Sequence, residues 1–148
     1  IAATNHHELL DPAIWRRFST VITLEKPHKQ EIKELLRSLL HDRKNNFLDN
    51  PKKCDCIVDA FYGLSHSDIK TILFSALRNV ILSDRDCLTN CDVLKEIYFH
   101  RNHTIDNEDE FISYLLSYGV THKELNEGLA IPLRKIQSVS KSIDRKEN

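Results

Sequence analysis

The stretch SHSDIKTILFSALRNVI, residues 65–81, decides the fold of this chain. Its apolar residues recur at spacings of three and four for more than three turns, which is typical of one buried helix face. These residues are Ile69, Ile72, Leu73, Ala76, Leu77, Val80 and Ile81. Ser65 is a good N-cap, and Asp68 is placed as the acidic partner of a capping box. The stretch therefore predicts an amphipathic helix beginning after Ser65.

Similar spacing and capping signals predict further helices on both sides of this one. They cover residues 28–43, 55–62 and 89–99, and then, in a smaller tail, 108–118, 121–129 and 132–143. The segment 45–53, rich in Asn, Asp and Pro, is expected to form a loop. The sequence thus predicts a mostly α fold with four helices in its central part.

The first 27 residues have a different texture. Two short runs, Ile1–Thr4 and Val21–Leu24, are apolar or rich in β-branched residues and predict buried strands. Asp11 and Pro12 predict the start of a short helix between them. Strands without sheet partners expose their edges, so we expect this region to be poorly ordered or prone to association unless another chain covers it.

Composition narrows the functional classes. Twenty-one Lys and Arg against twenty-two Asp and Glu give a formal net charge of -1, so no global field attracts nucleic acid or an anionic membrane. No apolar run approaches the roughly 20 residues of a membrane helix. We expect a soluble, cytoplasmic chain. The absence of Met and a start inside an apolar run indicate a fragment of a longer protein.

The four cysteines lie at positions 54, 56, 87 and 91. Thiolates at such positions can converge on a zinc ion, but neither pair has the usual C-x2-C spacing. Reduced cysteines also serve as small core residues in cytosolic proteins. The favoured interpretation is that the four cysteines are structural residues and do not form a metal site.

Residues 1–27 contain four ordered segments that together resemble the second region of homology of AAA-type (AAA+) ATPases. They are Ile1–Asn5, Leu10–Ala13, Arg16–Phe18 and Val21–Pro27. Further along, Gly63-Leu-Ser-His-Ser-Asp-Ile69 resembles the Gly-x-Ser-Gly-x-Asp-Ile signature that opens a lid helix in that family. The resemblance covers roughly residues 1–100.

The resemblance implies a domain organisation. Residues 1–27 would be the end of an α/β P-loop core, reduced to two short strands, and residues 28–103 a four-helix AAA lid. Residues 104–148 would be a small helical tail. No Gly-x4-Gly-Lys-Ser/Thr sequence and no strand ending in Asp-Glu are present, so this chain alone is not expected to hydrolyse ATP.

The resemblance also implies site residues. Asn5 matches sensor 1, whose amide helps to orient the attacking water. Arg16 and Arg17 match the paired arginines, one of which acts as a finger on the ATP of a neighbouring subunit. The family usually has Pro-Gly between them, whereas here they are adjacent; by order, Arg16 is favoured as the finger. Without the resemblance, the simpler interpretation is that Asn5 caps the turn after a strand and that the two arginines interact favourably with the dipole of the short helix.

Gly63, Ser65, His66 and Ser67 match lid residues whose backbone lies against adenine and ribose. His66 stands where the family usually has Gly, so its side chain would crowd the base or stack on it. ATP and Mg²⁺ are thus expected cofactors of an intact parent, with no tight binding to this chain. The parent is expected to be a homo-oligomer, in ring form, that remodels a protein or nucleic-acid client.

Two alternatives remain open. Residues 119–146 have the spacing of a helix-turn-helix, and Arg134, Lys135, Lys141, Arg145 and Lys146 would supply phosphate contacts to DNA. Ala130 occupies the turn position where Gly is preferred, and a helical appendage that packs on the lid or on a partner is the simpler interpretation. In the other alternative, the lid belongs to a degenerate ATPase and serves as an interaction domain.

Overall fold

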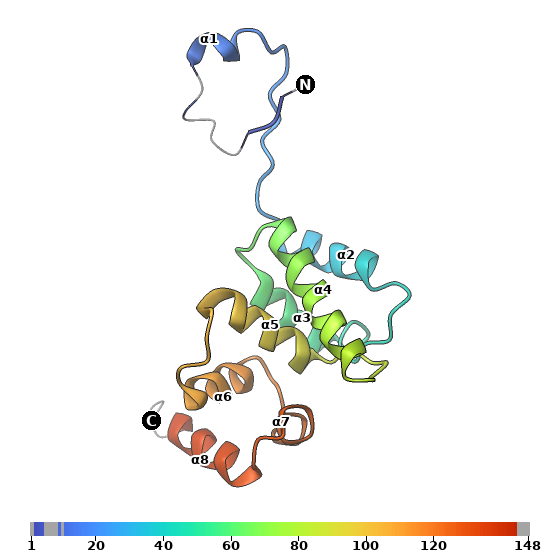
Figure 1. The fold of residues 1–148 in the computed structure, drawn as a ribbon, viewed down its shortest axis with the longest axis vertical. Helices are drawn as coiled ribbons and strands as arrows, with labels where there is room; N and C mark the ends of the chain where they lie inside the picture. Colours follow the sequence, from blue (N-terminus) through green and yellow to red (C-terminus); the bar gives the residue numbers. More distant parts are fainter. Residues whose placement is uncertain (1, 5–8, 10, 145–148) are drawn as a thin grey trace.

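The computed structural model describes residues 2–4, 9 and 11–144. The described chain is mostly helical, which confirms the mostly α prediction (Figure 1). The helices are α1 (Pro12–Trp15), α2 (Lys29–Leu39), α3 (Pro51–Phe61), α4 (His66–Leu82), α5 (Asn90–Asn102), α6 (Glu108–Ser117), α7 (His122–Leu129) and α8 (Leu133–Asp144). Over the described range none of them is both long enough and apolar enough to cross a membrane.

Capping explains where most helices begin. Reciprocal capping boxes start α4, α5 and α7, in each of which a hydroxyl and an acidic side chain three residues later exchange hydrogen bonds with each other's backbone. These pairs are Ser65 with Asp68, Thr89 with Asp92, and Thr121 with Glu124. The starts of these three helices are therefore marked by signals contained within four residues of sequence.

Three helix boundaries differ from the prediction. Helix α2 ends at Leu39 rather than near residue 43. Helix α3 begins at Pro51, inside the segment predicted to be a loop, because the Asn50 side chain accepts a hydrogen bond from a first-turn amide and Pro suits the first helical position. Helix α5 runs on to Asn102, where His103 ends it in a left-handed conformation with φ of 65°.

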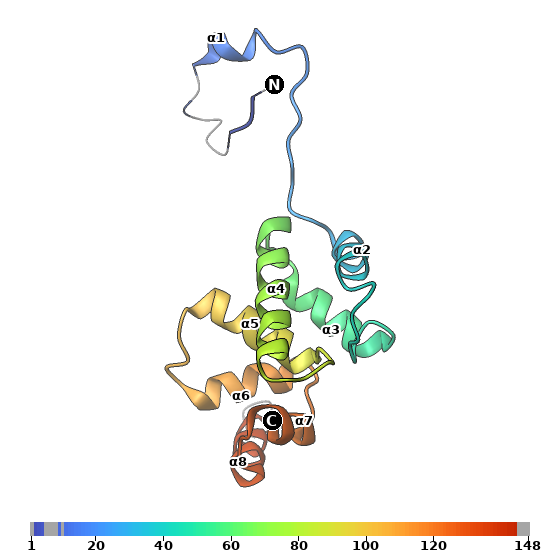
Figure 2. The same ribbon diagram turned by 45° about the vertical axis from the view of Figure 1, so that its right-hand side comes forward.

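Helix α5 lies at the centre of the fold, in contact with α3, α4, α6 and α7. Helix α2 packs on α3, and α8 packs on α6 and α7. The buried apolar side chains of the central helices and of the tail form one continuous cluster. Figures 1 and 2 show the tail helices gathered beneath α5. The helical tail therefore packs onto the four-helix part, which is one of the two placements that the simpler interpretation of the tail left open.

Two loops are joined at the far end of the four-helix part. A parallel bridge pairs Asn45 with Leu88, which brings the α2–α3 loop against the α4–α5 loop. Beside it, the side chain of Asn46 accepts a hydrogen bond from the backbone N–H of Asn90 at 2.8 Å and donates one to the Asn90 side-chain oxygen at 3.2 Å. Asn90 is only 2% exposed and is the buried polar residue of the described core.

The segment before α2 extends outward from the helical body (Figures 1 and 2). Residues 2–4 and 21–24 are not paired into strands, and Val21, Ile22 and Leu24 are 58%, 80% and 91% exposed. Residues 2–4 and 21–24 of the two predicted strands therefore form no strand, because apolar and β-branched composition produces a strand only where a sheet receives it; Ile1 lies outside the described residues. The domain boundaries at 27/28 and 103/104 stay predictions.

Candidate functional site

The candidate site is the loop between α3 and α4, residues 62–65, together with the first turn of α4. Gly63 has φ of +89°, a conformation that L side chains rarely adopt, and it ends α3 as the sequence predicted. The amides on either side of it stay bonded to the end of α3, from Tyr62 to Val58 and from Leu64 to Phe61. The chain thus turns sharply into α4 while its backbone remains tied down.

Ser65 and Asp68 fix the start of α4. The Ser65 hydroxyl oxygen accepts from the Asp68 N–H at 3.1 Å, and the Asp68 carboxylate accepts from the N–H and from the hydroxyl of Ser65, at 3.2 and 2.7 Å. These hydrogen bonds satisfy two of the amides that a helix start otherwise leaves without partners. The predicted capping box is confirmed.

His66 and Ser67 occupy the first two positions of α4, and both residues are exposed. Amides at these positions lie too early in a helix to bond to a carbonyl within it, and they point along the helix axis toward solvent. A helix start of this kind favours negatively charged or polar groups. The structure therefore presents backbone N–H groups and the His66 ring on one accessible edge.

Two cationic side chains brace the 62–65 loop. The Arg101 guanidinium, from the end of α5, donates to the carbonyl oxygens of Ala60 at 2.7 Å and Tyr62 at 3.4 Å. From the start of α2, the Lys29 ammonium pairs with Asp59 at 2.6 Å and lies 5.7 Å from the centre of the Tyr62 ring. The loop is thus held from α2 on one side and from α5 on the other.

The Asp68 carboxylate is surrounded by groups that favour its charge. Hydrogen bonds from Ser65 hold the pKa of the Asp68 carboxyl below its usual value, and positive charge on His100 and Lys26 acts in the same direction. The His100 ring nitrogen lies 3.8 Å from the carboxylate. Asp68 is therefore ionised at neutral pH, and the capping box retains its full strength there.

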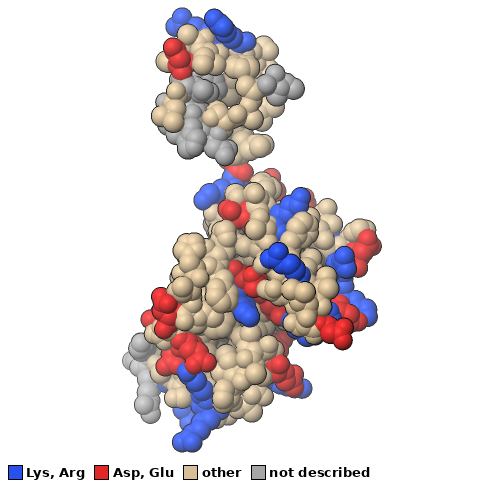
Figure 3. Space-filling view, viewed as in Figure 1, with Lys and Arg blue, Asp and Glu red and all other residues tan. Residues whose placement is uncertain are grey.

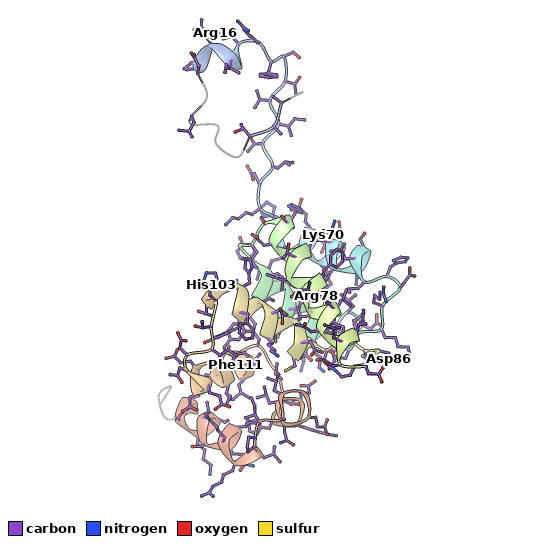
Figure 4. All side chains as sticks on the ribbon, viewed as in Figure 1. Arg16, Lys70, Arg78, Asp86, His103 and Phe111 are labelled. Carbon is purple, nitrogen blue, oxygen red and sulfur yellow. The ribbon has the colours of Figure 1, made fainter. Side chains whose placement is uncertain are left out.

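Arg16 and Arg17 lie elsewhere. Both are exposed and follow the single turn of α1, which Asp11 caps by accepting from Ala13 at 2.7 Å. Figure 4 shows Arg16 at the outer end of the amino-terminal segment, far from Lys70 on α4. The structure does not bring these arginines to the 62–65 loop within one chain. Asn5, the predicted sensor 1, lies outside the described residues.

Cys54 and Cys91 are buried, whereas Cys56 and Cys87 are partly exposed. Burial raises the pKa of the Cys91 thiol to about 12 and also raises that of Cys54. Across residues 2–4, 9 and 11–144, no group of three or more His, Cys, Asp or Glu side chains is arranged to hold a metal ion.

The sequence predicts the loop and its capping box but not the contacts that Arg101 and Lys29 make with the loop and the end of α3. Arg101 is a basic residue in the last turn of α5, and that position usually indicates an interaction with its own helix. Its partners instead lie 41 and 39 residues earlier in the chain. No local signal marks such a contact, since it depends on how α5 crosses α3.

Comparison with known proteins relates this chain to the AAA ATPases. The particular relative is the proteasome-activating nucleotidase of Methanopyrus kandleri, to which the chain is 35% identical over 101 residues, or 66% of its own length. The chain spans about a fifth of that relative, 22% of its length. No family model matches the chain, and no solved structure matches it.

Proposed function

We propose that this chain is the carboxy-terminal part of an AAA-type ATPase, with the end of the nucleotide-binding core in residues 1–27, a helical lid in 28–103 and a helical tail in 104–148. The intact protein would bind ATP and Mg²⁺ and hydrolyse ATP as an oligomer, in ring form, to remodel a protein or nucleic-acid client. The ordered motifs of the sequence and the similarity to a nucleotidase support this proposal.

The observation that carries the proposal is the geometry of the segment Gly63–Ile69. A left-handed glycine turn leads into a capped helix whose first two residues are exposed, and Arg101 and Lys29 brace the turn from neighbouring helices. A rigid backbone edge of this kind suits the close approach of a flat base and a ribose. The backbone of Gly63 and Ser65, with His66 and Ser67, would form this contact.

ATP supplies the phosphoryl group that is transferred to water. The arginines of this chain would act on the charge that develops there, because a guanidinium is permanently charged and grips two phosphate oxygens. Arg16 and Arg17 are exposed at the end of α1 and away from the lid loop of their own chain. That placement suits an arginine that serves the neighbouring subunit, with Arg16 as the finger.

Mutation of the arginines in the full-length protein tests this assignment. Arg16→Ala should lower kcat by a factor on the order of 10³ while the Kd for ATP stays within about twofold, because a finger acts on the transition state. Arg37→Ala, which removes an exposed arginine of α2, is the matched control and should leave both unchanged. Equal losses of ATP binding and turnover in Arg16→Ala, or unchanged turnover in both Arg16→Ala and Arg17→Ala, would refute the finger.

The sequence upstream of Ile1 separates this proposal from the degenerate-lid alternative. A motor requires a phosphate-binding Gly-x4-Gly-Lys-Ser/Thr loop and a strand that ends in Asp-Glu. Their joint absence from the full-length protein would leave an interaction domain of ATPase ancestry.

Two observations weigh against the DNA-binding alternative: the ion pairs of Lys135 and the distribution of surface charge. The helix pair α7 and α8 has the expected order, with Ala130 in a left-handed conformation at the turn. However, Lys135 is paired with Glu108 and Asp109 of α6 and is not free for phosphate. Figure 3 shows acidic and basic side chains interspersed over the visible face of the helical body, where a DNA-binding surface needs a continuous basic stripe.

A further inference from the structure

Helix α4 carries a second apolar face that the core does not use. Its buried side faces the core and is formed by Ile69, Ile72, Leu73, Ala76 and Val80. On another side, Phe74, Ile81 and Leu82 are 45%, 60% and 78% exposed. Only two other large apolar side chains between α2 and α8 are as exposed, Tyr62 and Leu133, so exposure of this kind is concentrated on α4.

These residues line a groove with the end of α2. The α2–α4 groove has a volume of about 370 Å³. It is lined by Leu39, Arg43, Phe74, Leu77, Arg78, Ile81 and Leu82. The five lining positions on α4 are spaced by three, one, three and one residues, which places them on one stripe of the helix. An apolar stripe in a groove between two helices is the form of surface that receives a third amphipathic helix.

The charges of the groove have one sign. Arg43 and Arg78 line it and no carboxylate does, while Lys70 lies at 5.6 Å from the centre of the Phe74 ring. Lys70 and Arg78 lie along the same helix (Figure 4). Arg78 makes a hydrogen bond to the hydroxyl of Ser75 at 3.3 Å, and within the described residues neither it nor Arg43 forms an ion pair.

Some other cationic side chains of the body are paired with acids, whereas Arg37, Lys52, Lys95, Arg134 and Lys141 form no ion pair with the described residues. Lys29 pairs with Asp59, Lys44 with Asp86 at 2.7 Å, and Arg85 with Asp92 at 2.6 Å. The groove is distinguished by having its two unpaired arginines beside an exposed apolar stripe, with no carboxylate in its lining. A partner with an apolar stripe and carboxylates beside it would bury the stripe and supply the missing charge.

We propose that the α2–α4 groove is a docking site for an amphipathic helix of a partner protein, in which an apolar stripe is flanked by Asp or Glu. The stripe packs against Phe74, Ile81 and Leu82, and the acidic flank meets Arg43 and Arg78. This site is separate from the 62–65 loop. The proposal does not depend on whether the chain belongs to an active ATPase.

A pair of twin peptides tests the site on the 148-residue chain. Each is a fluorescein-labelled helix of about 18 residues, or five turns, with the same leucine stripe and either Glu or Lys on its flanks. Fluorescence anisotropy should show binding of the Glu twin at least about tenfold tighter than that of the Lys twin. The preference should shrink at about 1 M salt, where charges are screened within roughly 3 Å.

Exposed positions supply variants that leave the core intact. The double variant Ile81→Ser/Leu82→Ser should weaken binding of the Glu twin by about tenfold or more, because both side chains lose apolar contact. Leu133→Ser, at an exposed apolar position of α8, should change it by less than about twofold. Arg78→Glu should reverse the preference so that the Lys twin binds better, whereas Arg134→Glu should not.

Three outcomes would overturn the proposal: equal binding of the two twins, no binding of either, or equal weakening by Leu133→Ser and the double variant. A fourth concerns a second copy of the chain. If sedimentation shows a dimer that forms with increasing concentration and is lost in Ile81→Ser/Leu82→Ser, the groove joins two copies and the proposed partner helix is wrong. Circular dichroism of each variant confirms that the helices are retained.

Discussion

Replacement of Asn46 by Ala tests how much the joined loops contribute to stability. The change removes both side-chain hydrogen bonds to Asn90, whose backbone N–H and side-chain oxygen then lack protein partners. Each buried polar group left without a partner costs about 1–3 kcal/mol. Because Asn46 itself is half-buried, water can reach part of the vacated space, so we expect the lower half of the summed range, about 3 kcal/mol.

Urea unfolding of the 148-residue chain, followed by circular dichroism, measures this loss, and thermal unfolding should show a fall in Tm of about 6–12 °C. Asn102→Ala is the matched control. Its side-chain amide donates to the Tyr98 carbonyl in its own helix at 3.0 Å and the residue is exposed, so a change of less than about 0.5 kcal/mol is expected.

The double variant Asn46→Ala/Asn90→Ala completes the cycle. Since it removes the orphaned side-chain oxygen together with its partner, it should cost about 1 kcal/mol less than the sum of the two single changes. Additive effects, or a loss for Asn46→Ala no larger than that for Asn102→Ala, would refute the conclusion that these loops are joined through buried hydrogen bonds.

Two further predictions concern the tail. Burial, the largest single influence on Glu124, raises its pKa, but hydrogen bonds from Lys53 and Thr121 outweigh burial and hold the pKa of this carboxyl below its usual value. The stability that it contributes is therefore present above the unfolded pKa of about 4.3 and is lost as pH falls through the lower folded value. Glu124→Gln should destabilise the chain by about 1–2 kcal/mol at pH 7. It should also reduce the fall of the urea unfolding midpoint as the pH is lowered, because the variant has no carboxyl to protonate. An equally steep fall in the variant and in the original chain would contradict this. Tyr114→Phe should raise the free energy of unfolding by up to about 1 kcal/mol, because the Tyr114 hydroxyl is buried without a partner among the described residues, and a clear loss of stability would show that the hydroxyl is satisfied in solution.

The helices that could be predicted from sequence are those with local signals at their ends. Ser65 with Asp68 and Thr121 with Glu124 gave the correct starts of α4 and α7, since a capping box is contained within four residues. The end of α5 at His103 could not be predicted, because a non-glycine residue in the left-handed conformation leaves no mark in composition. The start of α3 has a signal, Asn50 before Pro51, but Asn and Pro are also typical of a loop, which is the prediction for residues 45–53.

The strands were mispredicted for a different reason. Val21 to Leu24 have the composition of a buried strand, but a strand forms only against a neighbour, and apolar residues alone do not supply one. The candidate site divides in the same way. Its local turn and cap were predicted, whereas the contact of Arg101 with Ala60 depends on the crossing of two helices that are distant in sequence.

The position of helix α5 determines how the helical body can unfold. One end of it is fastened through Asn90 to the α2–α3 loop, the other through Arg101 to the end of α3, and four helices pack along its length. Separation of α3 or of the α2–α3 loop from α5 would break one of these hydrogen-bonded contacts, and separation of any of the four packed helices would expose buried apolar side chains. The four-helix part and the tail should therefore unfold as one cooperative unit. A displacement of the 62–65 loop should be transmitted through α5 and shift α6 and α7.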